Sequence, residues 1–168
     1  MINDLIDLIK VQSKNIEHYK QYPIALLFFI MLLLEVPLTF LSQSQGSSIA
    51  FTLTYNILIA FIFTFIEAAI FVYWFGRIGK KYSFLEFLHY DAILSIAAYI
   101  PVMIILLAYQ SFESLPWVGI IGFLVAIIYV FYMFIVNLAK ATDSSKKYAL
   151  VAIFIAAFLQ MIPEYIFL

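Results

Sequence analysis

The pattern of apolar and polar residues divides the chain into five long apolar runs separated by short polar segments. A transmembrane helix needs about 20 apolar residues, and each run is close to that length. The runs lack the alternation that marks the strands of a transmembrane barrel. We therefore expect an all-α integral membrane protein, with residues 1–168 forming one domain, a bundle of five transmembrane helices. The expected spans are 24–41, 49–75, 92–109, 117–138 and 148–168.

Residues 1–22 precede the first run and have a different pattern. Ile2, Leu5, Ile6 and Ile9 recur at helical spacing, while charged residues occupy positions between them. This pattern predicts a short cytoplasmic amphipathic helix over residues 3–19. Two interpretations stay open: the helix packs against the cytoplasmic ends of the bundle, or it offers a docking surface for a partner.

The nine Lys and Arg residues fall in three groups, before the first run, between the second and third, and between the fourth and fifth. Cytoplasmic loops carry the excess of Lys and Arg in membrane proteins. We therefore expect the N-terminus in the cytoplasm and the C-terminus on the opposite side. The groups are Lys10, Lys14 and Lys20; Arg77, Lys80 and Lys81; and Lys140, Lys146 and Lys147.

The basic loop between the second and third runs also carries signals for helix ends. Gly76 and Gly79 are typical of the end of the second helix. Ser83 and Glu86 match the S-x-x-E capping box, which predicts that the next helix begins before the membrane does. We expect this loop to contact a partner through Arg77, Lys80, Lys81, Ser83 and Glu86.

Composition agrees with a membrane location and excludes several functions. The chain is 66% hydrophobic and 11% charged, whereas soluble domains are about 45–50% apolar and about 25% charged. A net charge of −1 argues against nucleic-acid binding. The chain has no cysteine, which excludes disulfides and thiolate chemistry, and it has no common hydrolase or phosphate-binding motif. We expect no enzymatic activity, no cofactor and no metal site.

Three glutamates lie inside the expected spans: Glu35 in the first, Glu67 in the second and Glu164 in the fifth. A charge at mid-bilayer costs about 2.5 kcal/mol or more, so such residues usually face the bundle interior or a cavity. One interpretation is a polar site for a cation, a proton or a lipid headgroup, centred on Glu35 with Glu67 and Asn56 beside it. The other is that each acid is protonated and hydrogen-bonds between helices, with an interfacial position as a further alternative for Glu164.

Local signals predict features of individual helices. Pro37 and Pro101 lie inside the first and third spans and are expected to kink them, because proline removes a backbone donor. His89 and Asp91 lie near the inner boundary and are interpreted as solvated residues at the start of a helix. Asp143, in a polar loop, is expected to cap the fifth membrane helix.

The stretch "GRIGKKYSFLEFLHY", followed by "AAYIP" in the third span, resembles the Yip family of Ypt/Rab-interacting five-span membrane proteins, in its prokaryotic type. The polar loop "KATDSSKKYAL" also fits, so the resemblance covers most of the chain. It implies five close-packed spans and a membrane-organising or partner-binding role with no catalytic residue. The long N-terminus of eukaryotic members, with its Asp-Leu-Tyr-Gly-Pro type of motif, has no counterpart here, so GTPase binding is not expected.

Two functions are therefore expected as alternatives. The first is a non-enzymatic, Yip-like scaffold or membrane-organising or trafficking factor, whose partners are the lipid bilayer and another membrane protein or a second copy of the chain. The alternative is a small transporter or channel for a cation or proton that uses the intramembrane carboxylates.

Overall fold

The computed structural model describes residues 1–42, 48–111 and 116–167, with side chains described except at 38, 41–42, 108–111, 116, 118–119 and 160–167. These residues form helices and connecting turns, with no strand among them, which confirms the all-α class. The elements are α1 (Ile2–Ile9), the 3₁₀ helix η1 (Ile16–Gln21), α2 (Ile24–Ser42), α3 (Ile49–Gly76), α4 (Phe84–Ser111), α5 (Pro116–Ala141) and α6 (Lys146–Phe167).

Three helices are long and apolar enough to cross a membrane: α3 over Ile49–Gly76, α4 over Phe84–Leu107 and α5 over Ile120–Ala141. Within the described residues, α2 supplies a shorter apolar stretch, Ile24–Pro37. Only 17% of the most apolar part of α3 and 22% of that of α5 is buried inside the protein. Exposed apolar surface on this scale indicates contact with a membrane or a partner. The number of five spans and the orientation of the termini stay predictions.

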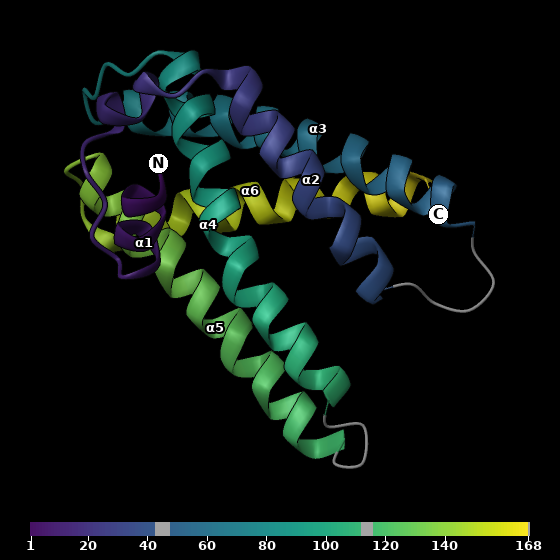
Figure 1. Cartoon of the computed structure of the whole chain (residues 1–168). Coiled ribbons are helices and arrows are strands. Elements are labelled where there is room, and N and C mark those ends of the chain that lie inside the picture. Colours follow the sequence, from purple (N-terminus) through teal and green to yellow (C-terminus); the bar gives the residue numbers. More distant parts are fainter. Residues whose placement is uncertain (43–47, 112–115, 168) are drawn as a thin grey trace.

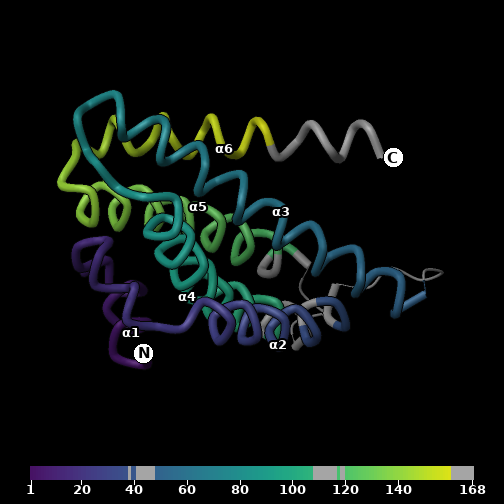
Figure 2. Tube along the Cα trace, turned by 90° about the horizontal axis from the view of Figure 1, so that it is seen from above, coloured from purple at the N-terminus to yellow at the C-terminus, as the bar shows by residue number. Residues whose placement is uncertain are grey.

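Helix α4 is the centre of the fold. It packs against α1, η1, α2, α3 and α5, while α6 packs against α3 and α5. Figure 1 shows that the long helices converge at the end of the molecule that holds α1 and then diverge, with α5 and the second half of α4 leaning away from α6. In Figure 2, α2 and α6 lie on opposite sides of the molecule.

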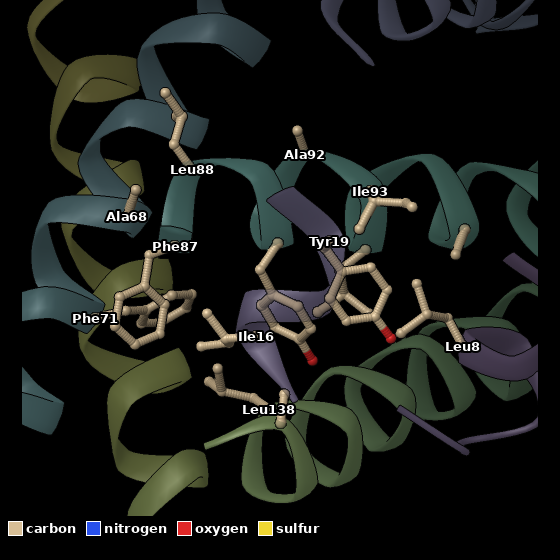
Figure 3. Packing of buried hydrophobic residues seen from close by; sticks show 14 of the residues in the cluster. Leu8, Ile16, Tyr19, Ala68, Phe71, Phe87, Leu88, Ala92, Ile93 and Leu138 are labelled. Carbon is tan, nitrogen blue, oxygen red and sulfur yellow. The ribbon is translucent and has the colours of Figure 1, made fainter. Parts of the chain in front are cut away.

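The hydrophobic core lies at the end where the helices converge. Along α4, Phe87, Leu88, Tyr90, Ala92, Ile93 and Leu94 are all buried. A helix that is apolar around its whole circumference is expected to be buried on all sides, and each large side chain removed from water contributes about 1.5–3 kcal/mol. Figure 3 shows that the core also draws side chains from the N-terminal segment, including Leu8, Ile16 and Tyr19.

The N-terminal segment is not the single helix expected over 3–19. Helix α1 ends at Ile9, because Val11 takes a left-handed conformation with φ of 62°. The amide of Val11 donates to the carbonyl of Leu8 (3.0 Å) and that of Gln12 to Asp7 (2.7 Å), which is the Schellman pattern that ends helices. Glycine usually occupies this position, since other residues pay about 1–2 kcal/mol there. The missing glycine is why the sequence pattern did not reveal the break.

Two other helices also end at a residue in the left-handed conformation, and the sequence predicted one of these ends correctly. Gly79 has φ of 78° and ends α3, as its sequence predicts. The prediction for Asp143 is wrong: with φ of 46° it terminates α5, while the Oγ of Ser145 accepts from the amide of Tyr148 (3.2 Å) and caps α6. Helices α2 and α4 continue through Pro37 and Pro101, so the kinks stay predictions.

Candidate functional site

The predicted capping box at the start of α4 is present. The amide of Ser83 donates to Oε2 of Glu86 (2.5 Å), and the amide of Glu86 donates to Oγ of Ser83 (3.3 Å). The other carboxylate oxygen of Glu86 forms an ion pair with Nζ of Lys20 (2.5 Å). One side chain therefore both starts α4 and holds the N-terminal segment.

The other basic residues of this loop have different environments. Lys80 reaches Asp143 in the α5–α6 connection (Nζ to Oδ2, 3.3 Å), and the guanidinium of Arg77 lies 5.4 Å from the ring centre of Trp74. Lys81 is exposed. The contacts join three segments that are distant in sequence: the N-terminal segment, the α3–α4 loop and the α5–α6 loop. Figure 1 shows these segments together at the end where the helices converge.

A buried carboxylate, Asp4, organises the N-terminal segment. It is 4% exposed, and its oxygens contact Nζ of Lys14 (2.6 Å), Nε2 of His18 (2.9 Å) and the hydroxyl of Tyr22. Burial alone raises the pKa of Asp4, but the hydrogen bonds from Lys14, Tyr22 and His18 outweigh it and hold that pKa well below its usual range. Burial, together with the hydrogen bond to Asp4, raises the pKa of Tyr22 to about 12.

Helix α5 binds the end of α1 through polar side chains that the sequence analysis did not single out as a group. Nδ2 of the fully buried Asn137 donates to the carbonyl of Leu8 (2.7 Å), and the hydroxyl of Tyr129 donates to that of Ile9. Nζ of Lys140 donates to the carbonyl of Val11 (2.6 Å). The last carbonyls of a helix lack partners within its own ladder, and Asn137 and Tyr129 supply donors to two of them. The sequence signal that could have revealed this contact is Asn137, an amide side chain inside an otherwise apolar run.

Two of the predicted intramembrane residues bind neighbouring helices. Glu35 on α2 is 8% exposed and accepts a hydrogen bond from the hydroxyl of Tyr99 on α4. Nδ2 of Asn56 on α3 donates to Oγ1 of Thr39 on α2 (3.1 Å). Glu35 and Thr39 lie one turn apart on α2, so these contacts form a polar seam that joins α2 to both α3 and α4.

Glu67 contacts Asp91 and is not part of the polar seam formed by Glu35 and Asn56. It is half-buried on α3, and its carboxyl group lies within hydrogen-bonding reach of that of Asp91 on α4. The interpretation of Asp91 as a solvated residue is wrong, because it is 0% exposed. The reason is that α4 is surrounded by other helices from its first turns. His89, two positions earlier, is half-buried, and its Nδ1 contacts the carbonyl of Leu85 (2.7 Å).

A cavity of about 140 Å³ lies beside Glu67, between α3, α5 and α6. Among the described side chains that line it, Glu67 is polar and the rest are apolar. They are Val130, Phe131, Phe134, Ile153 and Ala157. A water molecule in a protein needs two to four polar partners, so the described part of the lining favours an apolar occupant.

Glu164 lies in the part of α6 whose side chains are outside the described residues. Among the described side chains, no group of three His, Cys, Asp or Glu residues could hold a metal ion. Comparison of the chain with known protein families, with curated proteins and with solved structures found no match.

Proposed function

We propose that this chain is a non-enzymatic, five-span membrane protein that acts as a Yip-like scaffold or membrane-organising factor, with a cytoplasmic N-terminus and the C-terminus on the opposite side. In this proposal the bilayer covers the exposed apolar faces of α3 and α5. The partner, another membrane protein or a second copy, binds at the end that carries α1 and the basic loops.

The observation that carries the scaffold role is the use made of the intramembrane polar groups. Glu35 binds Tyr99, and Asn56 binds Thr39, so each joins two helices. Polar side chains within a membrane that hydrogen-bond across helices specify how the helices pack. A conduction path would instead need polar groups that face a common cavity, and the cavity next to Glu67 is otherwise apolar among its described lining residues.

The charge distribution supports the proposed orientation. Three contacts hold the three basic segments together at one end of the molecule. They are Lys20 with Glu86, Lys80 with Asp143, and Lys140 with the carbonyl of Val11. Cations collected at one end match the excess of Lys and Arg found on the cytoplasmic side of membrane proteins.

Transport of a cation or proton is the second candidate, favoured by the position of Glu67 at the cavity between α3, α5 and α6. Flux into liposomes separates the two functions. The scaffold predicts no proton or cation flux above that of protein-free liposomes. Flux in the wild type that Glu35→Gln or Glu67→Gln abolishes would refute a scaffold without transport.

Single introduced cysteines test the topology, because the natural chain has none and serves as its own blank. A membrane-impermeant maleimide should label Lys81→Cys and Lys147→Cys from the cytoplasmic side and Ser48→Cys, at an exposed position, from the other side. Labelling of all three from the same side would refute the proposed orientation.

A further inference from the structure

We propose that Glu67 and Asp91 form a proton-binding site between α3 and α4, in which at least one of the two carboxyl groups is protonated at neutral pH. The site goes beyond the scaffold role, and it differs from the seam around Glu35. Its ligand is a single proton taken up from the aqueous phase, which forms one O–H bond.

The first argument is the hydrogen-bonding capacity of the pair. Asp91 is fully buried, and neither of its oxygens accepts a hydrogen bond from a donor group of the described residues. The group within reach is the carboxyl of Glu67. An ionised carboxylate only accepts hydrogen bonds, whereas a protonated one has an O–H donor. The contact between the two groups therefore becomes a hydrogen bond only when one of them carries a proton.

The second argument is charge. Two adjacent carboxylates in an apolar interior repel each other, and each buried charge carries its own desolvation cost. The described titratable groups that act on Asp91 are Glu67 and Tyr90, its neighbour on α4, whose hydroxyl contacts Ser13 (3.5 Å) and whose ring packs on Tyr19 of η1. For Asp91, no Lys or Arg of the described residues is among them. On the side of α5 and α6, the described residues that line the cavity beside Glu67 are apolar.

The third argument distinguishes a proton from a metal ion. Magnesium takes six oxygen ligands and calcium six to eight. The described residues offer no third acidic or histidine ligand at this place. Two carboxyl groups without further ligands fit a shared proton better than a metal ion.

Infrared spectroscopy of the reconstituted full chain tests the site directly, because the C=O stretch of a protonated carboxyl is separate from the carboxylate bands and shifts in D₂O. At pH 7 the wild type should show this band, and Asp91→Asn and Glu67→Gln should each reduce it, since an amide donates to the remaining carboxylate without a bound proton. Asp143→Asn is the matched control, because that side chain is 97% exposed, and it should leave the band unchanged.

A protonated band of wild-type intensity in both amide variants would overturn the proposal. Because either variant could fail to fold, the thermal stability of the wild type in detergent gives a second measurement. It should fall from pH 7 to pH 9 as the proton is lost, and a flat profile would also count against the site. The liposome flux experiment is independent of this outcome, since a scaffold without transport can still hold the proton.

Discussion

Replacing Asn137 by alanine should make the N-terminal segment open more often while leaving the rest of the fold in place. The fully buried amide donates to the carbonyl of Leu8 at 2.7 Å and accepts from the amide of Ser13 at 3.2 Å. The Leu8 carbonyl keeps the Val11 amide as a partner, whereas the amide of Ser13 loses the acceptor that Asn137 supplied.

The size of the effect follows from these contacts. Two lost hydrogen bonds account for about 1 kcal/mol each, and the void left in a buried position adds up to about 1 kcal/mol. The total, about 2–3 kcal/mol, corresponds to a roughly 30- to 150-fold larger open population of the segment. This opening should leave α2, α3 and α6 protected, since the affected contacts lie between α1 and α5.

Hydrogen exchange followed by mass spectrometry, with the protein in lipid nanodiscs, measures this change. Amides within residues 2–15 should exchange roughly 30- to 150-fold faster in Asn137→Ala. Asn56→Ala is the matched control, because it removes an amide that joins α3 to Thr39 on α2, and it should leave residues 2–15 unchanged. Unaltered exchange of this segment in Asn137→Ala, or a uniform rise along the whole chain, would refute the reasoning.

Three further substitutions have defined outcomes in thermal denaturation experiments in detergent. In the folded protein the pKa of Asp4 lies below its ordinary value of 3.8. The stability that the Asp4 carboxylate contributes is therefore present above that pH and is lost as the pH falls below about 4. Asp4→Asn should remove this loss of stability in acid, and a pH profile equal to that of the wild type would contradict the prediction. Ser83→Ala should cost about 1 kcal/mol through loss of the cap, and Ser83→Asp should restore it; equal stability of the two variants would exclude a capping role. Glu35→Ala leaves the hydroxyl of Tyr99 without the acceptor that Glu35 supplied and should lower the free energy of unfolding by about 1–3 kcal/mol. Glu35→Gln keeps an acceptor oxygen and should lower it less, and equal losses in the two variants would contradict this role of Glu35.

Helix boundaries could be predicted where the sequence uses the usual residue for the local geometry. Gly79 ends α3 and Ser83 with Glu86 starts α4, and both were visible in the sequence. Val11 and Asp143 take the same left-handed position without glycine. Tertiary contacts, such as that of Lys140 with the Val11 carbonyl, hold these conformations. They depend on which helices meet, which a local pattern does not contain.

The same reason limits how much of the candidate site could be predicted. A polar residue inside a span needs a partner, so Glu35 and Asn56 were found, but their partners depend on how each helix is rotated about its axis. Asp91 was missed because its position along α4 suggested solvent, whereas lateral packing decides its burial. The pairing of Asp91 with Glu67 is a property of two helices together.

The contacts of α5 with the end of α1 constrain the order in which this protein matures. They join residues that are 120 to 129 positions apart. At a ribosomal rate of about 5–20 residues per second, the N-terminal segment waits roughly 6–25 s before α5, which donates these hydrogen bonds, has been synthesised. During that interval this segment of the nascent chain is undocked and open to chaperones, and it docks only after α5 has been made.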